Sequence, residues 1–165
     1  MAAERIRTSI GKSYFNEGTV KELKEDKFVL DKSRRFYLLD VIPMGAVRMT
    51  VSDKWKTNPN HADPRKRQRK AVQSYFAFKN KLQWECSLLK FELGCEIEVV
   101  FFMPMPESWS GKKKEKMNGF PHKQRSDCDN LVKSLQDTLL KEDGNVWSVN
   151  AKKYWAYNGS ILIYC

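Results

Sequence analysis

The sequence lacks the features that would direct it to a membrane, to secretion or to a structural zinc ion. No apolar run approaches the roughly 18 residues that a membrane-spanning helix needs. Residues 1–10 carry charges and have no apolar stretch of the signal-peptide type, so we expect a cytoplasmic protein. The four cysteines form no CxxC pair, and no histidine lies at zinc-finger spacing, which predicts reduced thiols.

Acidic residues are also scarce relative to basic ones. Thirty Lys and Arg stand against twenty Asp and Glu, which gives a net charge of +10. Each phosphate that meets a Lys or Arg releases counterions, so a basic domain gains affinity for nucleic acid of any sequence. An inert basic surface and a patch for anionic lipid are the alternatives. A disordered tail is excluded, because 41% of the chain is hydrophobic and 12% is aromatic.

The 165 residues fit one α/β (α+β) domain, with a mixed sheet of about four to five strands and two main helices. Strands are expected at 36–42, continued at 48–51, and at 95–105, 146–155 and 160–164. Helices are expected from Pro64 to before Gly94 and over 128–140, the first because apolar residues recur at three- and four-residue steps: Ala71, Tyr75, Phe78, Leu82, Cys86 and Leu89. The turn at 157–159 predicts a hairpin between the last two strands. Residues 36–165 form this domain, and residues 1–35 form an N-terminal extension of uncertain structure. Residues 107–125 make a loop long enough to suggest a function.

Two basic runs are candidate contacts to phosphate, although charge runs more often form solvated faces. The first run, before the first long helix, contains Arg65, Lys66, Arg67, Arg69 and Lys70, and the second, in the long loop, contains Lys112, Lys113, Lys114 and Lys116.

A pair of carboxylates lies where the second helix begins. Asp127 and Asp129 are one residue apart, so an extended chain would point both side chains the same way. Clustered oxygens of this kind suit Mg²⁺ or Mn²⁺. Lys133 follows Asp129 by four residues and shares its helix face. The structural alternative makes Ser126 the helix N-cap, Asp129 its capping-box acid, and Asp129–Lys133 an ordinary surface ion pair. In that alternative the acids of the first turn would simply favour the helix macrodipole.

Several ordered motifs resemble one known family. Residues 121–139, PHKQRSDCDNLVKSLQDTL, resemble the signature of the RusA-type Holliday junction resolvases, and Lys141–Val146 is similar to the acidic pair that follows it. Residues 42–50, with Asp53 and Trp55, look like the start of phage-type members. The resemblance covers about residues 36–165. Ser126 replaces a frequent proline, and the connection from the helix to Asp143 is short.

The resemblance implies a homodimeric, Mg²⁺-dependent endodeoxyribonuclease that resolves four-way DNA junctions by paired symmetric cleavage in recombination and repair. It assigns Asp127, Asp129 and Asp143 to the metal, for which Mn²⁺ would substitute, and Lys133 to catalysis. Asn130 and Glu142 would support the metal ligands. The further DNA contacts that it suggests are Arg48, Lys54, Arg125 and Lys153.

Three other functions fit part of the pattern. A non-catalytic DNA-binding module would use the basic surface alone, a structure-specific nuclease could act on flaps or forks, and an RNA-binding accessory protein would match only the charge. Trp109 and Phe120 could stack on unpaired bases or cover the core. His122 could anchor its loop, touch DNA or support the carboxylates.

Overall fold

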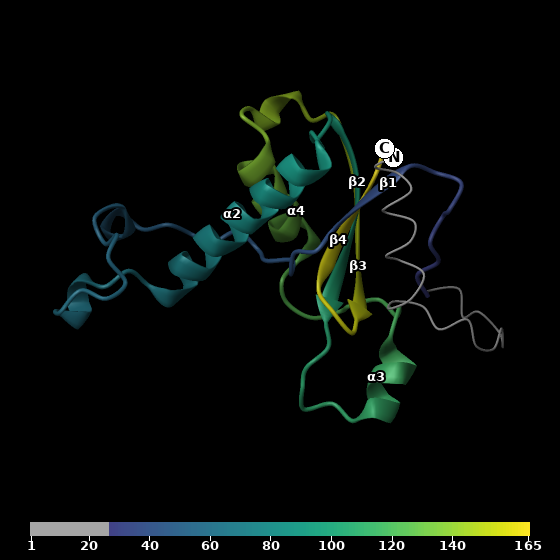
Figure 1. Cartoon of the computed structure of the whole chain (residues 1–165), viewed down its shortest axis with the longest axis horizontal. Coiled ribbons are helices and arrows are strands. Elements are labelled where there is room, and N and C mark those ends of the chain that lie inside the picture. Colours follow the sequence, from purple (N-terminus) through teal and green to yellow (C-terminus); the bar gives the residue numbers. More distant parts are fainter. Residues whose placement is uncertain (1–26) are drawn as a thin grey trace.

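A computed structural model describes residues 27–165, and these form one mixed sheet with helices beside it (Figure 1). Four strands and three α-helices are present in the described part, which confirms the predicted single α+β domain. The strands are β1 (Phe36–Leu39), β2 (Glu96–Pro104), β3 (Ser148–Ala156) and β4 (Ser160–Tyr164); the α-helices are α2 (Lys70–Leu89), α3 (Gly111–Met117) and α4 (Cys128–Leu139); and the 3-10 turns are η1 (Val51–Lys54), η2 (Pro64–Lys66) and η3 (Asp143–Asn145).

The sheet has the strand order β1-β4-β2-β3, and this order contradicts the predicted hairpin. β3 pairs in parallel with β2, from Glu96↔Ser148 to Pro104↔Ala156, whereas β4 pairs antiparallel with β2 and with β1. The chain turns at 157–159 as expected, but it then passes the end of β2 before β4 begins. All five residues of β4 are buried, and such a continuous apolar strand is stable between two neighbours.

Both faces of the sheet carry buried apolar side chains. On one face, Val99, Phe101 and Ile161 pack in one cluster with Leu82 of α2 and Leu135 of α4. A smaller cluster on the other face consists of Phe28, Val100, Phe102, Ala156, Leu162 and Tyr164. Because Phe28 is part of this cluster, the packed structure begins before residue 36. The rest of the proposed N-terminal extension, residues 1–26, lies outside the described residues.

The two long helices follow the predicted apolar pattern with local differences. α2 buries Val72, Tyr75, Phe78, Leu82 and Cys86, whereas Ala71, which we expected in this stripe, is exposed. Pro64 starts the short turn η2, so α2 begins later, at Lys70. The expected strand continuation at 48–51 is wrong, because Val51 begins η1 instead.

The long loop contains a helix that the sequence pattern did not predict. α3 has the sequence GKKKEKM, and none of its residues is buried, so it carries no apolar stripe for a periodicity argument to detect. The hydroxyl of Ser110 accepts a hydrogen bond from the Lys113 N–H and caps the helix.

The described part of the chain has neither a membrane-spanning helix nor a disulfide. None of the helices over residues 27–165 is long and apolar enough to cross a membrane. All four cysteines are free thiols, as expected, and burial raises the pKa of Cys86 to about 11. Cys86 therefore stays protonated at neutral pH and acts as a small apolar core residue.

Candidate active site

At the start of α4 the two carboxylates make neither the side-chain cap nor the ion pair of the structural alternative, while Asp129 lies in the first turn, where the helix macrodipole favours an acid. Asp127, not Ser126, is the N-cap, and its side chain caps no backbone N–H. Asp129 follows in the first turn and Lys133 one turn later, and all three side chains are exposed. Among the contacts of residues 27–165, no ion pair joins Asp129 to Lys133. The acids therefore remain available to bind a ligand.

Lys153 of β3 holds the loop that leads into α4. Its ammonium group donates hydrogen bonds to the carbonyls of Gln124, at 2.6 Å, and Ser126, at 2.5 Å. The backbone N–H of His122 donates to the Lys153 carbonyl at 2.9 Å. Lys153 was expected to contact DNA, but in the structure its ammonium group fixes the backbone immediately before Asp127.

Residues 43–47 hold the same loop from the other side. The Ala46 N–H donates to the Asn130 carbonyl at 3.2 Å, which joins this segment to the first turn of α4. A Cβ atom at Gly45 would overlap the Asn130 side-chain amide and lie 2.9 Å from Ser126 Oγ. Only glycine lets the backbone approach this closely, so Gly45 and Asn130 together set the position of the acidic pair.

If the acidic pair cleaves DNA, as the family resemblance implies, Gly45→Ala should reduce cleavage without unfolding the protein. The added methyl group must push Asn130 and Ser126 away, and a displacement of about 1 Å at a catalytic group can cost up to about 100-fold in rate. Gly111→Ala is the matched control, since nothing lies within 4 Å of its added Cβ. Initial rates of DNA nicking measure the effect, and equal rates for both variants would contradict it.

His122 is a buried anchor for this loop. It is 5% exposed, and its ring centroid lies 4.0 Å from that of Trp155. Burial, with help from the charge of Lys153, holds the pKa of His122 below its ordinary value, so the ring is neutral at pH 7. These contacts favour the loop-anchoring interpretation over contact with DNA.

The depressed pKa of His122 makes a stability prediction. Above pH 7 the ring is neutral in both the folded and the unfolded chain. As pH falls through about 6.5, the unfolded chain gains the proton first, so the free energy of unfolding should decrease. Urea unfolding at pH 7.5 and pH 5 measures this decrease. His122→Gln should lose less stability between these values than His61→Gln does; equal losses would contradict the assignment.

The two aromatic residues considered for base stacking pack within the protein. The Trp109 ring lies 4.9 Å from the Trp155 ring, and the ammonium of Lys113 sits 4.0 Å from the Trp109 centroid. Phe120 is partly buried, with the Lys27 ammonium 5.7 Å from its ring. These contacts favour the interpretation that Trp109 and Phe120 cover the core.

Asp143 lies at the opposite end of α4 from the acidic pair. It begins η3, its carbonyl accepts from the Val146 N–H, and the Trp147 N–H then donates to Cys95 at the start of the β2–β3 pair. Twelve helical residues separate the two ends by about 18 Å. No group of three or more His, Cys, Asp or Glu side chains within residues 27–165 could hold a metal. The expected convergence of three carboxylates therefore does not occur within one chain.

The basic candidates differ in what they contact. Arg69 is held by Asp53, with Nε 2.8 Å from Oδ1 and Nη2 2.5 Å from Oδ2. Arg67 donates to the His61 carbonyl. Lys114 is partly buried. The remaining candidates are exposed on η1, η2, the start of α2, α3 and the adjoining loops: Arg48, Lys54, Arg65, Lys66, Lys70, Lys112, Lys113, Lys116 and Arg125.

Exposed acids on a basic α+β domain define a candidate hydrolytic site for a phosphate substrate. A comparison with protein families matches residues 43–164 to the family described as endodeoxyribonuclease RusA. This match covers most of the chain, so the chain belongs to the RusA family of endodeoxyribonucleases, and membership implies an endonuclease that resolves Holliday junctions. No curated protein and no solved structure matches the chain significantly.

Proposed function

We propose that this protein resolves four-way DNA junctions in recombination and repair by Mg²⁺-dependent hydrolysis, and that it acts in the cytoplasm as a homodimer. The observation that carries the proposal is the family match over residues 43–164 together with unpaired carboxylates at the start of α4. Asp127 and Asp129 offer only oxygen atoms, and such donors suit hard divalent cations. Asp143 completes the proposed ligand set, and Mn²⁺ is expected to replace Mg²⁺.

Each proposed residue has a defined task in phosphodiester hydrolysis. A water oxygen attacks phosphorus as the bond to the leaving oxygen breaks. Asp127, Asp129 and Asp143 would hold Mg²⁺, which when bound would lower the pKa of the attacking water and neutralise charge on the scissile phosphate. The ammonium of Lys133, one helical turn from Asp129, stabilises the added negative charge of the transition state. Asn130 and Glu142 orient the ligands, in accord with the contact of Asn130 with residues 45–46.

The separation of Asp143 from the acidic pair supports a site shared between two chains. Since the two groups lie at opposite ends of α4, three carboxylates can meet only if a second chain supplies one of them. A twofold dimer would then form two identical sites, each with Asp127 and Asp129 of one chain and Asp143 of the other. Two sites match the two symmetric cuts that a four-way junction requires.

Strand β3 is the surface that suits such a dimer. It is an edge strand of the four-stranded sheet. Val149, in its first half, is 47% exposed, and Trp147, directly before the strand, is 74% exposed. Residues 119–122 bond to its second half, near Lys153–Trp155, and among residues 27–165 no strand pairs with the outer edge of Ser148–Lys152. Antiparallel pairing with a copy of itself would bring the beginning of one β3, near Asp143, towards the end of the other, near Lys153 and the acidic loop.

The proposed substrate is tested by comparing three DNAs of equal length. Purified protein is incubated with a synthetic four-way junction, a flap and a linear duplex, each with Mg²⁺, with Mn²⁺ and with a chelator. Symmetric nicks in the junction that need a divalent metal are expected. Preferred cleavage of the flap would favour a flap nuclease, and binding of all three DNAs without any nick would favour a non-catalytic module.

A further inference from the structure

Residues 48–69 form an arm that projects from the body of the domain (Figure 1). The arm leaves from the acidic site itself, because Ala46, two residues before it, is bonded to Asn130 of α4. It returns to the body where Lys70 begins α2. The base of this arm therefore lies beside the proposed cleavage site.

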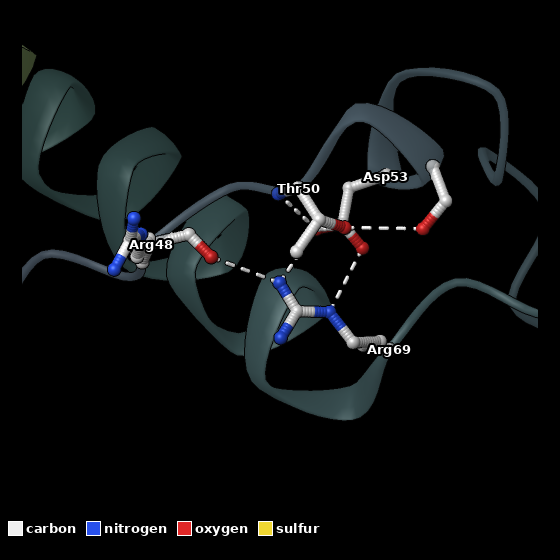
Figure 2. Close-up of polar contacts among 5 residues, drawn as sticks. Arg48, Thr50, Asp53 and Arg69 are labelled. Carbon is white, nitrogen blue, oxygen red and sulfur yellow. Dashed lines mark hydrogen bonds and ion pairs between the residues drawn. The ribbon is translucent and has the colours of Figure 1, made fainter.

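The arm is closed at its base by a buried acid. Figure 2 shows the Asp53 carboxylate, which accepts hydrogen bonds from Nε and Nη2 of Arg69. It also accepts two hydrogen bonds from Thr50, one from the backbone N–H and one from the hydroxyl, both at 2.7 Å. Arg69 Nη2 also donates to the Arg48 carbonyl at 3.0 Å. The Arg69 guanidinium keeps the pKa of Asp53 well below its usual range, so this closure persists at any physiological pH. The arm is therefore a formed element with a fixed base.

The closure leaves basic and apolar groups on the arm exposed. Trp55, directly after η1, is 82% exposed, and Val51 is 77% exposed. The arm carries seven basic residues and only two acidic ones, and both acids are paired within it, Asp53 with Arg69 and Asp63 with Arg65. Lys54 and Lys56 stand on either side of Trp55 in the sequence. A solvent-exposed indole with a lysine directly before and directly after it in the chain suits a base and its flanking phosphates.

We infer that Trp55 stacks on an unstacked base at the branch point of the DNA while the lysines beside it contact the flanking phosphates. This inference rests on the proposed junction substrate and adds the part of the protein that distinguishes a branch from a duplex. In a linear duplex the bases are stacked on one another and offer no free face. Trp109 cannot take this role, because its ring packs against Trp155 beneath Lys113.

The test uses a four-way junction that carries 2-aminopurine next to the branch-point base, so that its fluorescence rises when this neighbour leaves the stack. Binding is measured without divalent metal, so cleavage plays no part. Wild type should raise the fluorescence. Trp55→Ala should give no rise and bind the junction about 5- to 150-fold more weakly, the range that loss of one base–aromatic stack produces, with duplex affinity nearly unchanged. Trp55→Phe should recover part of both signals.

Trp84→Ala is the matched control, since Trp84 is 61% exposed on α2, outside the arm. Three results would overturn the inference: wild-type behaviour of Trp55→Ala, an equal loss in Trp84→Ala, or a change of Trp55→Ala from dimer to monomer on sedimentation, which would assign Trp55 to contact between copies. Normal junction cleavage by Trp55→Ala with no change in binding rejects the stacking role alone. A fluorescence rise in a protein that never cleaves the junction rejects the proposed function alone.

Discussion

Asp129→Asn should abolish junction cleavage and leave junction binding close to that of wild type. The substitution keeps the size of the side chain but removes the charge that holds the metal, and loss of a ligand should exceed the roughly 10- to 100-fold cost of losing a residue that only supports the ligands. Because Asp129 is exposed and bonds to no side chain among residues 27–165, folding should be unaffected. Single-turnover cleavage and gel-shift titration measure the two properties.

The matched control for Asp129→Asn is Glu115→Gln. It removes one negative charge from an exposed position on α3, outside the proposed ligand set, and it should cleave at the wild-type rate. Cleavage by Asp129→Asn at the rate of this control would reject the proposed metal site. Loss of binding together with cleavage would instead assign Asp129 to the DNA interface.

Two inactive proteins should become active when their chains are mixed. In a dimer with one Asp129→Asn chain and one Asp143→Asn chain, a shared site places both changes in the same active centre and leaves the other centre intact. Random exchange in an equal mixture should therefore restore about a quarter of the wild-type sites. If each site belonged to one chain, every site in the mixture would be damaged and no activity would return. Nicking of the junction during co-refolding of the two variants distinguishes these outcomes.

A surface variant checks that restored activity depends on the dimer. Val149→Asp puts a charge on the free edge of β3 and should yield monomers on analytical ultracentrifugation. Introduced into both chains, it should prevent the recovery. Phe76→Asp is the matched control, because Phe76 is also 47% exposed but lies on α2. Recovery that persists in monomers would reject the shared site.

The sequence was most informative where one local pattern determines the structure. The apolar spacing of Tyr75, Phe78 and Leu82 predicted α2, and the run from Cys95 to Met105 predicted β2 within one residue at each end. The acidic motif placed Asp127 and Asp129 at the start of α4, where they lie. Local rules were sufficient for these elements because each one carries its own apolar face and its own end signals.

The same patterns could not show which strands become neighbours. A turn was correctly predicted at Tyr157-Asn158-Gly159, but a turn does not show whether the strands on either side of it pair with each other. The fully buried β4 pairs with β1 and β2 instead of β3. Likewise, the motif around Asp143 gives its identity and not its distance from Asp129, which the length and direction of α4 determine. The closure of the arm by Asp53 and Arg69, sixteen residues apart, also has no local signal.

The position of β4 has a consequence for how the protein is made. β1 is synthesised early, yet in the described part of the chain its strand partner is β4, which leaves the ribosome after every other strand. The sheet therefore cannot close before residues 160–164 have been synthesised, and the long separation of its paired segments slows its formation. A translation product that stopped before β4 would lack the strand that joins β1 to β2, so we expect it to be inactive in cleavage.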